Sequence, residues 1–307
     1  MKQVSGRVAT TADRDTIVAM ALYALAVVLL TFVAAPNERV VASPGPATGP
    51  APRPPELSGP EIAQELIDAP RFAQVEKPRS IHVNRSWQMV GGVGVNVVTV
   101  NPKAPNVHIV LGLAEGTVLS KGRFGRETFG DMVRRFRPRV AVNGTYFNMR
   151  TNEPVGALVM EGRLIYDGLC SVGLLINEQG DAWFEYHPGA YGRHIGWQPD
   201  IATAICAGPS LLKGGRLNLH PGDEGFSDPS LFALARRTAV GVTGSGKLLF
   251  ITIHTPINLN KLAHIMMRLG CVDAMNLDGG SSCGLYSNGQ YITLPKRQLT
   301  NLILIYD

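Results

Sequence analysis

One short segment of the chain gathers residue types that could do chemistry on a polar substrate. It is the run Asn276-Leu277-Asp278-Gly279-Gly280-Ser281-Ser282, which places a carboxylate, an amide, two glycines and two hydroxyls directly after an apolar stretch. Glycines let the backbone approach a ligand closely and turn its N–H groups toward an anion. An Asp-Gly pair alone usually marks a hairpin turn, but a two-residue turn does not account for the whole run. Asp278 is therefore the leading candidate for a carboxylate at a site.

A second segment, Asn143-Gly144-Thr145-Tyr146-Phe147, also follows an apolar stretch and is polar and Gly-containing. Ligands of open α/β sheets bind beyond the carboxyl ends of strands. We therefore expect both turns to end strands of one sheet and to converge on one pocket. In that pocket Asn143 would either bind a substrate hydroxyl or hold its turn, and the sequence does not choose between these roles.

Two amphipathic segments with helical spacing lead into the strands that carry these turns. One helix is expected at 129–136 before a strand at 139–142, and another from Asn258 to Gly270 before a strand at 272–277. Six further apolar or β-branched runs bounded by Gly, Asn and Pro are expected strands, at 93–100, 107–113, 157–160, 173–176, 248–253 and 302–306. The pattern predicts an α+β fold, with a single domain at 73–307 built on a mixed, mostly antiparallel sheet flanked by helices.

The N-terminal part of the chain has a different character. Residues 17–35 are 19 consecutive residues without charge, Gly or Pro, close to the ~20 that a membrane-spanning helix needs. We expect a transmembrane helix or signal anchor at 17–35, with residues 1–16 cytoplasmic and the following domain outside the cytoplasm. A cleaved signal peptide is the alternative. Residues 36–72 are rich in Pro and Gly and are expected to form a linker with a short helix.

The charge and the cysteine content argue against nucleic acid and zinc as partners. The net charge is +5, and the densest basic run, at 134–139, falls at the end of an expected helix. This placement favours a solvated helix end over a nucleic-acid surface. The four cysteines include no close pair, which argues against a zinc site, and they allow either free buried thiols or up to two disulfides in three pairings. No calcium-binding loop is present, and the sequence predicts neither a metal nor a cofactor.

Five segments, taken in order, resemble the phosphodiester glycosidase family. They are Val142-Asn143-Gly144-Thr145-Tyr146-Phe147, Pro154-Val155-Gly156, Ala207-Gly208-Pro209-Ser210-Leu211, Arg237-Thr238-Ala239-Val240-Gly241-Val242, and Ala274-Met275-Asn276-Leu277-Asp278-Gly279-Gly280-Ser281-Ser282. The resemblance covers about 95–307. Thr145 stands where a glycine is expected, and His254 stands where the family often has an acidic residue.

The resemblance implies a hydrolase that cleaves the glycosidic bond of a sugar-1-phosphodiester in an exported or cell-surface glycan. Such a reaction passes through an oxocarbenium-like transition state that a carboxylate stabilises, a role that suits Asp278. The leaving phosphate needs a cationic clamp, for which Arg237 is the leading candidate because a guanidinium presents paired donors.

The remaining expectations of the resemblance are weaker. Catalytic support is expected from Asn143, from Glu224 or Asp228 as a second carboxylate, and from His254 as a proton shuttle. Substrate contacts are expected from the two turns and from one further loop, at Gly144, Tyr146, Gly208, Pro209, Gly279, Gly280, Ser281 and Ser282. The expected partners are a phosphorylated glycan and the membrane.

Two other motifs match enzymes of different classes. The run 241–247 has the spacing of a phosphate-binding loop, but Leu248 replaces the metal-binding hydroxyl residue and a strand-like segment follows. The run 280–284 matches the nucleophile elbow of a serine hydrolase, with Ser282 as nucleophile, but a hairpin is expected after it instead of a helix. A serine hydrolase, and a domain that binds an anionic polysaccharide without cleaving it, are therefore the alternatives.

Overall fold

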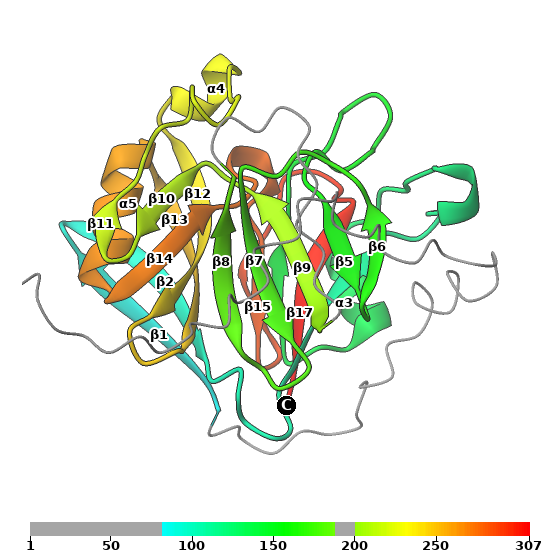
Figure 1. The fold of residues 1–307 in the computed structure, drawn as a ribbon, viewed down its shortest axis with the longest axis horizontal. Helices are drawn as coiled ribbons and strands as arrows, with labels where there is room; N and C mark the ends of the chain where they lie inside the picture. The colour runs from blue at the N-terminus through cyan, green and yellow to red at the C-terminus, as the bar shows by residue number, and fades with distance from the viewer. Residues whose placement is uncertain (1–81, 188–199) are drawn as a thin grey trace, which may run out of the picture. The chain divides into compact units, whose positions relative to one another are not determined.

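The computed structural model describes residues 82–187 and 200–307, all within one compact unit, Ala51–Asp307 (Figure 1). The expected membrane helix at 17–35 and the linker at 36–72 lie outside the described residues. Among the helices that are described, none is long and apolar enough to cross a membrane.

Three antiparallel sheets make up the described part of the fold. The largest, the seven-stranded sheet, has the order β1-β2-β13-β12-β14-β10-β11. Its strands are β1 (Val83–Val90), β2 (Val93–Val100), β10 (Ser210–Lys213), β11 (Arg216–Leu217), β12 (Ala235–Thr243), β13 (Leu248–Ile257) and β14 (Cys271–Asn276). The other two sheets have five strands each, and we name them the β4 sheet and the β9 sheet.

The β4 sheet has the order β16-β15-β4-β17-β3, and the β9 sheet has the order β6-β5-β9-β7-β8. The strands of the β4 sheet are β3 (His108–Leu113), β4 (Val140–Asn143), β15 (Leu285–Ser287), β16 (Gln290–Thr293) and β17 (Asn301–Tyr306). Those of the β9 sheet are β5 (Leu158–Met160), β6 (Arg163–Tyr166), β7 (Val172–Asn177), β8 (Ala182–Tyr186) and β9 (Ile201–Ala207). The three sheets can be followed in Figure 1.

The central core lies where the three sheets face one another. Phe250, Ile303 and Leu174, from one strand of each sheet, belong to one buried cluster. Side chains alternate between the two faces of a strand, so the neighbours of these residues point the other way. Those neighbours are also buried, because further layers cover the outer faces. This two-sided burial explains the nearly continuous apolar runs of the central strands.

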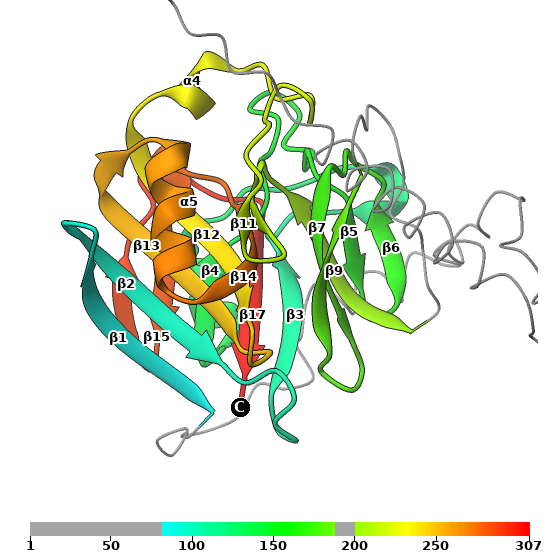
Figure 2. The ribbon, with the colours of Figure 1, turned by 60° about the vertical axis from the view of Figure 1, so that its left-hand side comes forward.

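Two helices supply these outer layers. Helix α5 (Leu259–Arg268) packs on the outer face of the seven-stranded sheet, with Leu262 and Met266 buried against Ile251 (Figure 2). Helix α3 (Phe129–Phe136) packs on the β4 sheet, with Met132 and Phe136 buried against Leu304. Side chains cap both helices: Asn258 accepts from the Lys261 N–H and Thr128 accepts from the Asp131 N–H. Both helices occupy the segments that the sequence predicted.

Three short helices complete the secondary structure of the described residues. They are η1 (Leu119–Lys121), α4 (Pro229–Phe232) and η2 (Gly280–Ser282). The fold is thus mostly antiparallel with few helices, as predicted, but the expected single mixed sheet is wrong. All pairings between named strands are antiparallel, and the strands divide into three sheets.

Both look-alike motifs lie in hairpins. The run 241–247 connects β12 to β13, which pair antiparallel. The strand after Ser282 is β15, which pairs with β16. Neither motif is followed by the helix that a phosphate-binding loop or a nucleophile elbow requires.

Candidate functional site

The two polar turns singled out in the sequence lie side by side. Asn143 Nδ2 donates to the Asp278 carbonyl at 2.7 Å, and the Asp278 N–H donates to the Gly144 carbonyl at 3.2 Å. The turns meet as expected, but for a different reason, and within the described residues the pocket of about 210 Å³ beside them is lined by Thr145 and Tyr146 of the first turn and by no residue of the second. β4 belongs to one sheet and β14 to another, so the packing between sheets brings the turns together, and not the shared edge of a single sheet.

Asn143 is the link between these turns. Its side chain is 1% exposed, and its Oδ1 accepts from Thr238 Oγ1 at 2.9 Å and from the Gly284 N–H at 2.9 Å. Together with the bond to the Asp278 carbonyl, these contacts engage both ends of the carboxamide. Of the two roles that the sequence left open, the hydrogen bonds match the one that holds the turn.

Asp278 has a partly buried carboxyl whose pKa is raised. Burial raises its pKa from 3.8 to about 6, while the Ser282 hydroxyl, the Arg297 charge and the Gly279 N–H oppose this rise. Ser282 Oγ is close enough to act on the carboxyl, although the geometry falls short of a full hydrogen bond. A carboxyl with this pKa changes its charge near neutral pH, as acids and bases in active sites commonly do.

Unpartnered oxygens mark the same place. Within the described residues, three buried side-chain oxygens of the two turns make no hydrogen bond: Thr145 Oγ1, Asn276 Oδ1 and Ser282 Oγ. Leaving such an atom unpaired costs roughly 1–3 kcal/mol, so a cluster of them is expected where a ligand supplies the missing partners. The sequence flagged Thr145 only as a departure from the family pattern.

A pocket of about 210 Å³ adjoins the turns. Its lining comes from three of the quoted motifs and two further segments, and includes Thr145, Tyr146, Gly156, Glu224, Phe226 and Asp228. Gly156 has no room for a side chain, because a Cβ there would lie 1.7 Å from the Cys206 carbonyl oxygen. The close backbone approach at Gly156 therefore helps to form the wall of the pocket.

Tyr146 connects this pocket to Asp278. Its hydroxyl donates to the Gly208 carbonyl at 2.7 Å and accepts from Asn276 Nδ2. Burial and the Asp278 carboxylate raise the pKa of Tyr146, against the opposing charge of Arg237. The phenol therefore stays neutral. Tyr146 lines the pocket, and the charges of Asp278 and Arg237 act on its hydroxyl.

Glu224 brings a second carboxyl to the pocket. It accepts from Ser171 Oγ at 2.8 Å and from the Ser210 N–H at 3.0 Å. Burial raises the pKa of Glu224, while these donors oppose the rise. The structure places Glu224 in the same pocket as Tyr146, and Asp228 lines it as well.

Arg237 is buried, with 2% of its surface exposed. Its Nε donates to the Ile257 carbonyl at 3.1 Å, and its Nη2 donates to the Leu231 and Ala233 carbonyls at 2.9 and 2.6 Å. Burial lowers the pKa of Arg237. These bonds tie the α4 segment to β12 and β13, so two of the three guanidinium nitrogens already serve the fold.

Two other arginines border the Asp278 turn, and the sequence reasoning missed both. The Lys296 N–H donates to the Ser281 carbonyl at 2.7 Å, which places exposed Arg297 beside the turn, where its charge acts on Asp278. Arg236 Nη2 donates to the Leu294 carbonyl at 3.3 Å, while its buried Nε has no partner among the described residues. The basic pair 296–297 directly before β17 was the only sequence signal for Arg297.

His254 lies on β13, where its Nε2 is 2.7 Å from Thr293 Oγ1. Burial and the Arg236 charge lower its pKa. This position places His254 next to Arg236 on the basic side of the turn. No hydrogen bond joins it to Asp278 within the described chain.

The glycines and Pro209 of the expected substrate-binding set shape the walls of the site. A Cβ on Gly144 would lie 2.0 Å from Asn301 Oδ1, and one on Gly279 would lie 3.0 Å from the Arg236 carbonyl oxygen. The Pro209 carbonyl accepts from the Asn276 N–H at 3.0 Å. Gly280 has a φ of 59° at the start of η2 and open space around it. Close packing explains the glycines at 144 and 279, and a positive φ explains the glycine at 280.

One disulfide reinforces the pocket. Cys170 and Cys206 are bonded, and each precedes a residue of the pocket lining, Ser171 and Ala207. The other two cysteines are free and buried, and burial raises the pKa of Cys271 to about 12 and that of Cys283 to about 11. Neither thiol therefore ionises near neutral pH. No group of three or more metal-binding side chains is found in residues 82–187 and 200–307.

Comparison with known protein families identifies the family of this chain. The phosphodiester glycosidase model matches residues 137–306, more than half of the chain. The chain belongs to the phosphodiester glycosidase family. The match contains all five quoted segments and confirms the resemblance on which the sequence analysis relied.

Two curated relatives agree with this membership. The N-acetylglucosamine-1-phosphodiester alpha-N-acetylglucosaminidase of Mus musculus is 23% identical and that of Bos taurus 25%, each over 55% of this chain. The chain spans only 38% and 35% of their lengths.

Solved structures show the same fold at low sequence identity. The catalytic domain of the zebrafish enzyme of that name, auto-inhibited by its pro-peptide, has a TM-score of 0.57 at 19% identity, covering 73% of this chain and 82% of that one. A hypothetical protein from Synechocystis has a TM-score of 0.55 at 19% identity, covering 73% and 61%.

Proposed function

We propose that this phosphodiester glycosidase hydrolyses the bond between the anomeric carbon of a sugar and the oxygen of a phosphodiester in an exported or cell-surface glycan. The single observation that carries the proposal is the Asp278 carboxyl, partly buried, with a pKa of about 6, among three unpartnered oxygens. The family membership and the printed activity of the mouse and bovine relatives supply the bond type.

Asp278 is the group that faces the anomeric carbon in this proposal. Above pH 6 it is mostly ionised, and its negative charge stabilises the oxocarbenium-like transition state or attacks the carbon directly. Asn143 holds the Asp278 backbone in position through its bond to the carbonyl oxygen. Thr145, in the other turn, lines the pocket that receives the sugar.

The basic side of the turn receives the phosphate. A phosphate leaves as a stable anion, so a cation is more useful there than a strong general acid. Arg297 is exposed beside Asp278, and Arg236 has an unpartnered Nε. We assign the direct phosphate contacts to these two residues. Arg237, expected from the sequence to be the clamp, supports them by fixing the α4 segment and by its charge near Tyr146.

The acidic side of the site receives the sugar. Glu224 and Tyr146 line the pocket next to Asp278, and carboxylates are good acceptors for sugar hydroxyls. Glu224 also keeps the role of second carboxylate, since it lies in the same pocket as Tyr146 and burial raises its pKa. His254 lies near Arg236 and is assigned to proton transfer on the phosphate side.

The site is proposed to lie outside the cytoplasm, on a chain anchored by residues 17–35. The uncharged 19-residue run supports the anchor. The Cys170–Cys206 disulfide supports the compartment, because disulfides persist in oxidising environments and are rare in the cytosol.

A panel of sugar-1-phosphodiesters tests the proposal. The full-length protein is incubated with each compound, and free reducing sugar and the released phosphomonoester are measured together. Equal release of both products supports the proposal. Tight binding of the panel without release would favour a domain that only binds anionic glycans, and no binding at all would overturn both ideas.

Two variants separate the glycosidase from a serine hydrolase. Asp278→Asn should lower the rate at least about a hundredfold, because it removes the transition-state carboxylate. Ser282→Ala should retain much of the activity, since Ser282 is fully buried and its Oγ has no partner among the described residues. An active Asp278→Asn variant beside an inactive Ser282→Ala variant would favour the serine hydrolase.

A further inference from the structure

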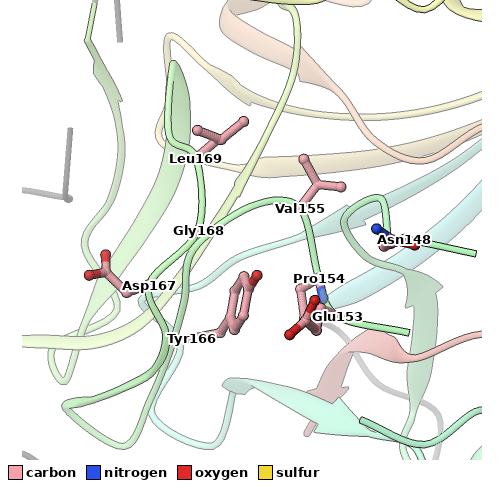
Figure 3. A pocket seen from close by; sticks show the side chains of 8 residues that line it. All are labelled: Asn148, Glu153, Pro154, Val155, Tyr166, Asp167, Gly168 and Leu169. Carbon is pink, nitrogen blue, oxygen red and sulfur yellow. The ribbon is translucent and has the colours of Figure 1, made fainter. Parts of the chain in front are cut away.

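A second pocket, of about 350 Å³, borders the pocket that contains Tyr146. The two pockets share Val155 and Leu169 in their walls, and Figure 3 shows these two side chains together at one end of the second pocket. The Leu169 N–H donates to the Val155 carbonyl at 2.8 Å, which fixes the shared wall. The two pockets are therefore neighbours, and a ligand long enough to span this wall can occupy both.

The second pocket contains a fixed aromatic ring. The Tyr166 ring packs edge-to-face on Phe124, with centroids 5.4 Å apart and planes at 88°. In Figure 3 it stands between Asp167 on one side and Pro154 and Glu153 on the other. A ring held in this way offers a rigid apolar face with a polar tip, which suits the C–H face and the hydroxyls of a sugar.

Hydrogen-bonding groups surround that ring. Asn148 Oδ1 accepts from the Arg150 N–H at 2.8 Å, which orients the amide, and its amide nitrogen makes no hydrogen bond within the described residues. Glu153 accepts from Thr151 Oγ1 at 2.7 Å, which fixes the carboxylate while leaving it further acceptor capacity. Donors and acceptors of this kind match sugar hydroxyls.

The charge of the second pocket excludes a phosphate. Glu153 and Asp167 both line it, and none of its lining residues in the described part of the chain is Lys, Arg or His. After burial, these two carboxylates are the causes that raise the pKa of Tyr166. An anionic group entering here would meet like charges at short range, which is unfavourable. We therefore expect the phosphate to lie outside this pocket, beside the exposed Arg297.

The sizes of the two pockets lead to the same conclusion. Ligand pockets typically measure about 300–1,000 Å³. The pocket at Tyr146, with about 210 Å³, is below that range and suits part of a substrate, whereas the second pocket, with about 350 Å³, falls within it. A substrate with a single sugar would leave the larger space unused.

We propose that the second pocket is a subsite for the uncharged sugar unit that precedes the cleaved sugar. This inference rests on the proposed function and adds the substrate class: an oligosaccharide-1-phosphodiester is preferred over its monosaccharide counterpart. Tyr166 supplies the stacking surface, and Glu153, Asp167 and Asn148 supply the polar contacts.

Paired substrates test the subsite. The full-length protein is assayed on a hexose-1-phosphodiester and on disaccharide-1-phosphodiesters that extend it through each of its free hydroxyls. We expect at least one extended compound to have a kcat/KM about tenfold higher or more. Tyr166→Ala should remove that gain while leaving the rate on the single hexose unchanged. Glu178→Gln, which alters a carboxylate in a separate pocket, should leave the gain intact.

A charged extension tests the exclusion of anions. A disaccharide substrate whose outer unit carries a carboxylate should lose the gain, and Asp167→Asn should restore part of it. Equal rates on single and extended sugars, or a gain that survives in Tyr166→Ala, would overturn the subsite and leave the proposed function standing.

Binding separates failure of the subsite from failure of the proposed function. If the wild-type protein cleaves none of the phosphodiesters, the proposed function is wrong, and neutral disaccharides are then titrated as ligands by calorimetry. Binding that Tyr166→Ala abolishes and Glu178→Gln preserves would still support the sugar site. No binding of any neutral disaccharide would overturn it.

Discussion

Replacing Asp278 by Asn should make the folded protein more stable at neutral pH while it removes activity. Burial raises the pKa of Asp278 from 3.8 to about 6, so the folded chain holds this proton more tightly than the unfolded chain does. As the pH rises from about 4 to 6, the unfolded chain loses the proton first, and the free energy of unfolding falls. The ionised carboxylate therefore costs stability above pH 6, and that cost is absent below the ordinary pKa.

The size of the effect follows from the pKa. A change from 3.8 to about 6 corresponds to about 3 kcal/mol. The carboxyl is partly exposed, and solvent screening reduces this figure. Asn keeps an oxygen that can accept from the Gly279 N–H, so the turn keeps this bond. We expect Asp278→Asn to raise the free energy of unfolding by about 1–3 kcal/mol at pH 7.5 and by almost nothing at pH 4.

Urea unfolding at both pH values measures this difference. Glu178→Gln, at an exposed carboxyl of a separate pocket, is the control and should change stability little at either pH. A sugar-1-phosphodiester assay run in parallel should show a loss of at least about a hundredfold for Asp278→Asn. An Asn variant that is less stable than the wild type at pH 7.5, or that shows the same gain at pH 4, would refute the electrostatic reasoning.

Three further substitutions test the surroundings of Asp278. Asn143→Ala removes the bonds to the Asp278 carbonyl, Thr238 and a backbone N–H, and should lower the free energy of unfolding by about 2–4 kcal/mol and reduce kcat, as urea unfolding and kinetics will show. Arg297→Gln removes a charge that lowers the Asp278 pKa. The pKa that defines the acidic limb of the pH–rate profile should therefore rise by up to about one unit. An unchanged pKa in this limb would contradict the placement of Arg297. Gly144→Ala puts a Cβ 2.0 Å from a side-chain oxygen and should abolish cooperative thermal unfolding or lower Tm by more than about 5 °C.

Local sequence patterns were sufficient to predict the two main helices and the two polar turns of the site. Helix α3 follows from the spacing of its apolar residues, and α5 begins at the Asn258 cap and ends before Gly270. The two polar turns that follow the strands at 139–142 and 272–277 could also be recognised, because in each turn polar residues and Gly come directly after an apolar strand. Pairing between strands is a long-range property, however, and the sequence did not reveal that β4 and β14 belong to different sheets.

The same distinction explains the errors at the site. Arg237 has the charge that a phosphate clamp needs, but its surroundings decide its role, and three backbone carbonyls surround it. Arg297 stands in a loop without a motif, and only the contact between Lys296 and Ser281 shows that it adjoins Asp278. The pairing of Cys170 with Cys206 was likewise one of three that the sequence allowed, and the fold selects it.

The three-sheet construction also bears on how this enzyme family can diversify. The Asp278 turn extends from the seven-stranded sheet and is held by the β4 sheet, whereas Tyr166 ends β6 and Leu169 and Ser171 precede β7 in the β9 sheet. The proposed acid and the walls of the proposed sugar subsite thus belong to separate sheets. Insertions and substitutions in the β5–β7 connections can change which sugar is accepted while the hydrogen bonds that hold the acid remain intact.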